Sequence, residues 1–342
     1  MKIAINKKGL FAERWISYCK ENNIYYKTVN CYDDDIVKQL SDCNAFMWHH
    51  SHASSQDVQF AKQLLFSLEQ AGMKVFPNFK TTWHFDDKVG QKYLLEAINA
   101  PFVPSYVFYS KKEALSWVES ITFPKVFKLR GGAGSANVRL VKTKHKAKRL
   151  ISKAFGSGFA QYNKFGSLKD RWGKYRLGKT NLFDVLKGCV RIFYTTDFAR
   201  NIGNERGYVY FQDFIPDNKY DIRIVVIEDR AFGLKRIVRK NDFRASGSGN
   251  IIYNKSEISE DCVKIAFDIN KKLKTQCVAI DFVFNGKQAL IVEISYGFLP
   301  KGYDSCEGYW DNHLNWHEGK INPYGWMIEN LLRKIPKNHT HR

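Results

Sequence analysis

Residues 279–295, AIDFVFNGKQALIVEIS, consist of two apolar runs separated by Asn285-Gly286. An Asn-Gly pair between two such runs is a strong signal for a tight turn, so the sequence predicts a β-hairpin here. Each predicted strand carries one acid, Asp281 on the first and Glu293 on the second. A carboxylate on an apolar strand is costly unless a cation compensates its charge. The hairpin therefore predicts a site that holds cations.

Two interpretations of this acid pair are open. Paired carboxylate oxygens suit Mg²⁺ that is held jointly with phosphates, and Ser295 lies two residues beyond Glu293 on the same strand face. The alternative is a structural ion pair with Arg236 or Lys235.

A glycine-rich loop, GGAGS at residues 131–135, joins two further apolar runs. Glycine lets the backbone approach a ligand closely, and the free N–H groups of such a loop can surround phosphate oxygens. Lys128 lies on the run that enters the loop, and Lys88 opens an earlier predicted helix. Two lysines beside the loop could neutralise a triphosphate; the alternative is an ordinary turn.

Arginines follow at Arg223, Arg236, Arg239 and Arg244. Residues 208–214, 221–228 and 231–238 are predicted to be a run of antiparallel strands, which would bring Arg223 and Arg236 close together. Guanidinium groups aimed at one point can stabilise a transferring phosphoryl group or orient a carboxylate. Exposed arginines on strands are the alternative.

The first 80 residues alternate short apolar strands with helical patterns, which predicts a small, mainly parallel α/β domain. Its first turn, at residues 6–9, lacks the glycine pattern of a dinucleotide site. The following His49-His50-Ser51-His52 has no Cys or acid at metal-ligand spacing, so we expect it at a strand end.

The chain of 342 residues has a formal net charge of +20, and residues 142–206 hold 16 Lys and Arg against 4 Asp and Glu. Such a charge predicts an anionic partner or a solvated basic insertion. The seven cysteines form no CxxC pair, and no apolar stretch approaches 18 residues. We therefore expect a reduced, cytoplasmic protein with no membrane-spanning segment.

Taken in their order along the chain, these motifs resemble those of the ATP-grasp superfamily. Their pattern is most similar to that of the glutathione synthetase and ribosomal-protein glutamate ligase type. The resemblance runs from Asp86 to Pro300. It implies an α/β chain with an ATP-grasp fold behind a Rossmann-like, parallel-sheet domain. The expected units are residues 1–85, residues 86–210 with the basic insertion at 142–206, and residues 211–342 with the acid hairpin and an aromatic C-terminal segment.

The resemblance also implies roles for individual residues. The nucleotide would contact Lys88, Lys128, Gly132, Gly134, Ser135, Gln212, Asp213, Phe214, Ile215 and Asp221. Arg223, Arg236 and Arg244 would face the γ-phosphate and the acceptor carboxylate, and Asp281, Glu293 and Ser295 would bind Mg²⁺ or Mn²⁺.

Three positions depart from the family pattern. Ser295 stands where the third metal ligand is usually Asn, and Gln212 stands where many members carry Glu. Ala279 stands where some peptide ligases of the superfamily place a substrate-binding arginine. The amino-acid substrate of those ligases is therefore not carried over.

The function implied is that of an ATP-dependent ligase that joins a carboxylate to an amine through an acyl phosphate. The charge favours an acidic sugar or uronic acid of a surface polysaccharide as acceptor, with an anionic or lipid-linked glycan on residues 142–206. One alternative is a ligase that adds amino acids to a small acid or peptide. Another is a non-enzymatic module that binds a polyanion such as nucleic acid or an anionic membrane through residues 142–206. That segment matches no nucleic-acid motif.

The aromatic residues 309–318 would either cover the substrate cleft or pack on the last domain. The oligomeric state stays open.

Overall fold

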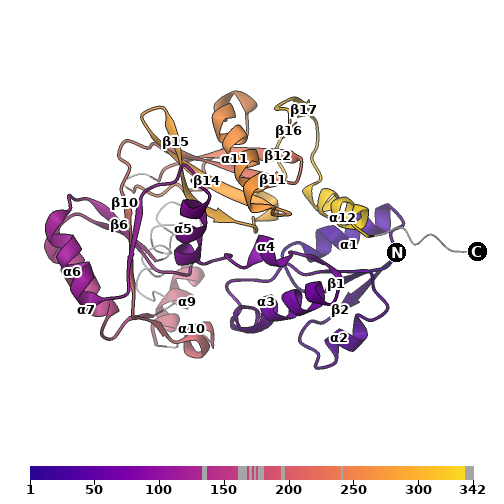
Figure 1. The fold of residues 1–342 in the computed structure, drawn as a ribbon, viewed down its shortest axis with the longest axis horizontal. Coiled ribbons are helices and arrows are strands. Elements are labelled where there is room, and N and C mark those ends of the chain that lie inside the picture. The colour runs from indigo at the N-terminus through magenta and orange to yellow at the C-terminus, as the bar shows by residue number, and fades with distance from the viewer. Residues whose placement is uncertain are drawn as a thin grey trace, which may run out of the picture.

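The computed structural model describes residues 1–132, 137–160, 168, 172, 175, 181–193, 197–239 and 242–335. Three units follow one another along the chain, each built around its own sheet (Figure 1). None of the helices in these residues is long and apolar enough to span a membrane.

The N-terminal unit has a four-stranded parallel sheet in the order β2-β1-β3-β4, as the sequence predicts. Helices pack on it because their apolar residues recur on one face, and the Ser54 side chain caps the longest of them by accepting from the Asp57 N–H. The strands are β1 (Ile3–Asn6), β2 (Tyr26–Val29), β3 (Ala45–Met47) and β4 (Lys74–Phe76), and the helices are α1 (Ala12–Glu21), α2 (Ile36–Gln39), α3 (Ser55–Gln70) and α4 (Phe79–Thr82).

The central unit has an antiparallel sheet in the order β5-β10-β6-β7. Its elements are β5 (Ser105–Phe108), β6 (Lys125–Lys128), β7 (Val138–Val141), β10 (Val209–Asp213), α6 (Lys111–Ser120) and α7 (Lys144–Ala154). Helix α5 (Lys88–Ala97) precedes them in the chain but packs on the C-terminal sheet, where Leu95 is buried. Strand β10 inserts between β5 and β6, so the prediction that residues 208–214 join the following strands in one antiparallel run is wrong. Its residues Val209 and Phe211 are buried in the apolar core of the central unit, and this burial holds the strand there.

The C-terminal sheet runs β15-β14-β11-β12-β16-β17, with β13 paired to β12. Its strands are β11 (Tyr220–Ile227), β12 (Arg230–Ile237), β13 (Ile251–Ile252), β14 (Val278–Asn285), β15 (Gln288–Ser295), β16 (Gly308–Asp311) and β17 (Trp316–Glu318), with helices α11 (Glu260–Leu273) and α12 (Pro323–Arg333) and single 3₁₀ turns at Lys255–Glu257 and Pro300–Gly302. The predicted hairpin is present: β14 and β15 pair antiparallel, Gly286 turns with φ +60°, and Asp281 lies directly opposite Glu293.

The N-terminal unit and the C-terminal sheet share one apolar core. Phe11 and Trp15 of the first unit belong to the same buried cluster as Phe232, Phe298 and Trp326 of the last. Helix α12 returns to lie beside α1 (Figure 1). Because of this shared core, the segment after β15 is held against loops of the N-terminal unit.

The aromatic C-terminal segment packs on its own domain. Strand β16 extends the sheet beside β12, with Trp310 opposite Ala231, and β17 pairs with β16. Of the two predicted alternatives, packing on the domain is therefore the one observed.

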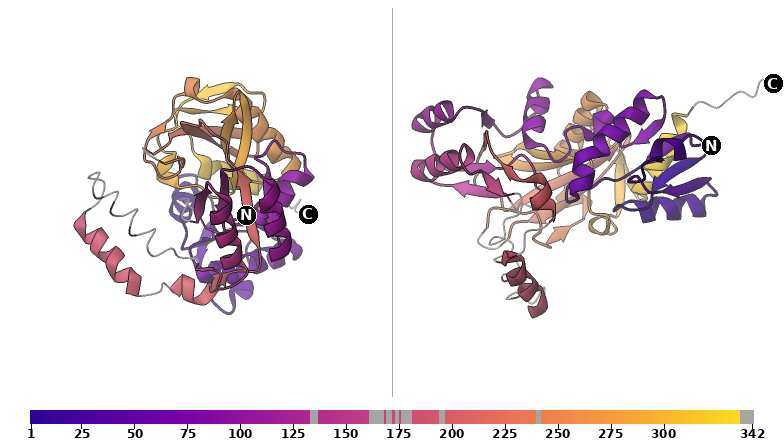
Figure 2. Two further views of the ribbon diagram at one scale, coloured as in Figure 1. Left: turned by 90° about the vertical axis from the view of Figure 1, so that its left-hand side faces the viewer. Right: turned by 90° about the horizontal axis from the view of Figure 1, so that it is seen from below.

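The described part of the basic segment begins in the central unit with α7, and its helix α10 (Asp197–Ile202) contacts α3 of the N-terminal unit. Helix α7 carries Lys144 and Lys148, which both form ion pairs with Glu119 of α6. The short strands β8 (Phe159–Ala160) and β9 (Asn204–Glu205) pair with each other and so bring the ends of the intervening segment together. Helices α9 (Leu182–Phe193) and α10 belong to it, and α9 stands apart from the main body in both views of Figure 2. Most of residues 161–180 lie outside the described residues.

Candidate active site

A cavity of about 680 Å³ lies where the three units meet. Every predicted site residue that the structure describes lines it. These residues are Lys88, Lys128, Gly132, Gln212, Asp213, Phe214, Ile215, Asp221, Arg223, Arg236, Arg244, Asp281, Glu293 and Ser295. Gly134 and Ser135 lie outside the described residues.

Lys88 is the first residue of α5, a helix whose start is capped by the Asp87 carboxylate accepting from the Gly90 N–H at 2.9 Å. The Lys88 Nζ donates to the Gly132 carbonyl at 3.0 Å and lies 3.3 Å from Glu293 Oε1. Burial on its own would lower the pKa of Lys88, but Glu293 and Asp86 outweigh it and raise the pKa. Lys88 therefore carries its charge at neutral pH.

Lys128, at the end of β6, lies opposite Tyr210 of β10 and has a different environment. Its Nζ donates at 2.6 Å to Gln212 Oε1, a neutral acceptor, and it forms no ion pair with a described carboxylate. Burial lowers the pKa of Lys128 to about 8, although Glu293 acts in the opposite direction. The departure from Glu to Gln at residue 212 thus leaves a buried lysine that an anionic ligand would stabilise in its charged form.

We call residues 212–215, at and just beyond the end of β10, the hinge, and they form one side of the cavity. Gln212 is fixed by donating to Ser105 Oγ at 3.1 Å, and Asp213 accepts from Lys125 at 2.5 Å. Beyond them Phe214 lies 5.9 Å, centroid to centroid, from Phe243 in the loop after β12. The valines that line the cavity beside this hinge are Val103, Val126, Val283 and Val292. This arrangement makes an apolar slot bordered by strand backbone.

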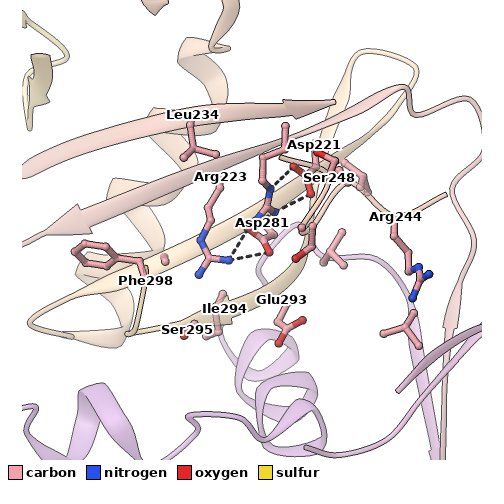
Figure 3. Close-up of a pocket in the computed structure, with 18 of the residues that line it drawn as sticks. Asp221, Arg223, Leu234, Arg244, Ser248, Asp281, Glu293, Ile294, Ser295 and Phe298 are labelled. Carbon is pink, nitrogen blue, oxygen red and sulfur yellow. Dashed lines mark hydrogen bonds and ion pairs between the residues drawn. The ribbon is translucent and has the colours of Figure 1, made fainter. Parts of the chain in front are cut away.

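Asp281 of β14 is shared by Arg223 of the adjacent strand β11 and by Arg236 of β12, the next strand beyond it (Figure 3). Arg223 Nη1 donates to its two oxygens at 3.2 and 3.1 Å, and Arg236 Nη2 lies 2.9 Å from Oδ1. Arg236 also donates to both oxygens of Asp221 at 2.7 Å. Although burial opposes it, the two guanidinium groups lower the pKa of Asp281. The predicted ion pair with Arg236 is therefore present, whereas Lys235 pairs with Glu257.

Arg244 lies apart from the other two arginines. In Figure 3 it stands on the opposite side of the carboxylates from Arg223 and Phe298. Its Nε donates to both oxygens of Asp242 at 3.0 and 2.9 Å, which holds it within its own loop. The structure brings Arg223 and Arg236 together but does not direct Arg244 at the same point.

The acid pair fits a divalent cation that takes part of its ligands from a phosphate. Asp281 and Glu293 face the cavity from adjacent strands, and no group of three His, Cys, Asp or Glu able to hold a metal occurs among the described residues. Mg²⁺ commonly takes one or two protein carboxylates together with phosphate oxygens. The Ser295 hydroxyl is engaged locally, since it donates to the Gly297 carbonyl and accepts from the Gly297 N–H, both at 3.1 Å.

Comparison with known proteins agrees with this geometry. Residues 195–298 match the family of the RimK-like ATP-grasp domain. This segment, which is less than half of the chain, is therefore identified as a RimK-like ATP-grasp domain. No relative was found among curated protein sequences.

Solved ATP-grasp structures extend the likeness over almost the whole chain. A RimK domain protein from Sphaerobacter thermophilus has a TM-score of 0.55 at 14% identity, covering 97% of this chain and 100% of that one. D-alanine–D-alanine ligase from Bacillus anthracis in complex with ATP has a TM-score of 0.54 at 14% identity, covering 97% of each chain. The ATP-grasp ligase PsnB, in complex with a minimal precursor, has a TM-score of 0.55 at 12% identity, covering 97% of this chain and 98% of that one. At these identities the likeness establishes the fold, and the expected ATP-grasp architecture is confirmed.

Sequence reasoning missed one wall of this cavity. Residues of the N-terminal unit and of the segment after β15 line it, and the set comprises Leu10, His49, His52, Phe85, Gly297, Phe298, Leu299, Gly302 and Tyr303. A usable signal was their position: His49 and His52 follow the carboxyl end of β3, where open parallel sheets bind ligands.

The shared carboxylate predicts a large effect of Asp281→Asn on stability. Arg223 and Arg236 are 17% and 12% exposed, so losing the charge between them leaves Arg223 without its carboxylate partner and Arg236 with Asp221 alone. We expect the free energy of unfolding to fall by about 3–5 kcal/mol, measured by urea denaturation. The control, Asp268→Asn, removes one partner of an exposed helical pair with Lys272 and should cost less than about 1 kcal/mol. Equal losses in the two variants would contradict the account.

Proposed function

We propose that this protein forms an amide bond between a carboxylate and an amine, with ATP converting the carboxylate into an acyl phosphate. The observation that carries the proposal is the placement of Lys88, Lys128, Asp281 and Glu293 around one cavity, with Arg223 beside them. This set compensates polyphosphate charge next to a group that can orient a carboxylate.

The proposed position of the nucleotide follows from the polarity of the residues that line the cavity. The apolar slot beside Phe214 and Ile215 suits adenine, and the two lysines with the Gly132 backbone suit the phosphates. Asp281 and Glu293 would hold Mg²⁺ or Mn²⁺, which would supply neutralisation of phosphate charge when bound.

Arg223 and Arg236 are fixed in place before any ligand binds, because both are bonded to Asp281. Such preorganised donors stabilise charge that develops during phosphoryl transfer without having to reorient. No cysteine lines the described cavity, and burial raises the pKa of Cys306, whose backbone N–H donates to the carbonyl of the wall residue Tyr303, to about 12. Activation of the acid by phosphorylation needs no such nucleophile, and enclosure between three units would limit hydrolysis of the acyl phosphate.

The acidic-sugar acceptor and a glycan bound to residues 142–206 stay predictions, as does the peptide-ligase alternative. The polyanion-binding alternative predicts steeply salt-dependent binding that needs no ATP. A deep cavity that joins an apolar slot to buried lysines favours the ligase over a surface that binds polyanions.

The first test supplies ATP, Mg²⁺, a panel of carboxylic acids and hydroxylamine, which intercepts an acyl phosphate as a hydroxamate. We expect ADP and hydroxamate to form in equal amounts and only when an acid is present. Lys128→Ala and Glu293→Ala should lower the rate by at least about a hundredfold, because each removes a group beside the phosphates. Lys272→Ala, on the exposed face of α11, is the matched control and should keep the wild-type rate. Unchanged turnover in both site variants would refute the assignment of the site.

The second test uses the titration of Lys128. Its pKa of about 8 in the free protein means that it is charged below pH 8 and loses its proton above it. Since phosphates bind the charged form, the Kd for ATP should rise about fivefold between pH 8 and pH 9. Lys128→Arg keeps its charge throughout this range, so its Kd should stay flat. A pH dependence of the same size in Lys128→Arg would assign the effect to another group.

A further inference from the structure

The part of the cavity farthest from Arg244 in Figure 3, beyond Arg223, has a chemistry of its own. We call it the aromatic end. It is built by the N-terminal unit and by the segment after β15, and its members are Leu10, His49, Phe85, Phe298, Leu299 and Tyr303.

The wall of the aromatic end is fixed by packed rings. Phe298 lies 5.1 Å from Tyr303 and 4.9 Å from Phe11, centroid to centroid, and all three belong to the core shared by the two units. Gly297 closes the corner, because a Cβ there would lie 3.0 Å from His49 Nε2. These side chains are therefore held in place without a ligand, as in a preformed pocket.

The aromatic end offers a ligand little charge. The described lining residues contributed by residues 1–85 and by residues 297–303 include no lysine or arginine. Burial lowers the pKa of His49 to about 3 and raises that of Tyr303 to about 12, so both are neutral at physiological pH. Arg223, at the border of this end, is already bonded to Asp281 and to the Gly297 carbonyl.

The side chains that the C-terminal sheet contributes beneath the aromatic end are apolar as well. Leu234 and Ala279 line it from β12 and β14. A second carboxylate on the substrate would find no cation here, and burying it would be costly.

Two exposed leucines stand at the aromatic end. Leu10 is 53% exposed and Leu299 is 61% exposed, and they come from different units of the chain. Exposed apolar side chains gathered at a cavity are typical of sites that bind an apolar group.

We infer that the acid used by this protein carries one carboxylate and an apolar group about the size of an aromatic ring. The carboxylate faces Arg223 and the phosphates, and the apolar group packs on Phe298 and Tyr303. This inference rests on the proposed function, and it disfavours both an acidic sugar and a free α-amino acid as the acceptor held in the cavity.

The test compares acids of similar size in the hydroxamate assay. 3-Phenylpropionate and hexanoate form the apolar series, and D-glucuronate, glutarate and L-glutamate form the polar series. We expect kcat/KM to be at least about tenfold higher for the apolar series, since an apolar pocket distinguishes ligands by the surface they bury.

A binding measurement makes the inference independent of turnover. Calorimetry with a non-hydrolysable ATP analogue present should show 3-phenylpropionate binding, and Leu299→Asp should weaken it by about tenfold. Val37→Asp places the same charge on α2, at a residue that is 60% exposed and does not line the cavity, and should leave binding unchanged. Binding of the nucleotide analogue reports that each variant is folded.

The outcomes separate the two proposals. Preference for the polar series overturns the aromatic end as the acid site and leaves the ligase standing. Binding of 3-phenylpropionate that Leu299→Asp weakens, without hydroxamate from any acid, supports the aromatic end and overturns the ligase. If 3-phenylpropionate does not bind and no acid gives hydroxamate, both proposals are overturned.

Discussion

The carboxylate of Asp281, held between the guanidinium groups of Arg223 and Arg236, is the interaction on which the cavity depends. The three residues come from adjacent strands of one sheet, and the β14–β15 pairing sets Glu293 directly opposite Asp281. Each charge would be costly at this burial without the others. The cluster therefore fixes strand register and, at the same time, presents two arginines and two carboxylates to one cavity.

The two lysines of the cavity differ in how their charges are compensated. Lys88 is already compensated by Glu293, whereas Lys128 is bonded to a neutral amide and has a lowered pKa. An anionic ligand gains most from Lys128, because it restores the charge that burial disfavours. The replacement of Glu by Gln at residue 212 thus has an electrostatic consequence that the family pattern alone does not indicate.

Local sequence patterns were sufficient for the parallel sheet, for the hairpin at Asn285-Gly286 and for the described candidate residues that line one cavity, because turn chemistry and the order of motifs determine them. They did not place β10, whose partners are set by burial in the central core, nor Arg244, whose orientation depends on Asp242 in its own loop. The aromatic end was missed for a related reason. It forms only where the N-terminal unit packs against residues 297–303, and no segment of the sequence shows that contact by itself.

The central claim is that ATP activates a carboxylate as an acyl phosphate. The most direct measurement supplies an acid labelled with ¹⁸O in its carboxylate, together with ATP, Mg²⁺ and an amine, and follows the label by mass spectrometry. The account predicts that one ¹⁸O per turnover appears in inorganic phosphate, because the acyl phosphate breaks between carbon and the bridging oxygen when the amine attacks. Phosphate free of ¹⁸O, with the oxygen that the acid loses on forming the amide found in water or in AMP instead, would contradict it.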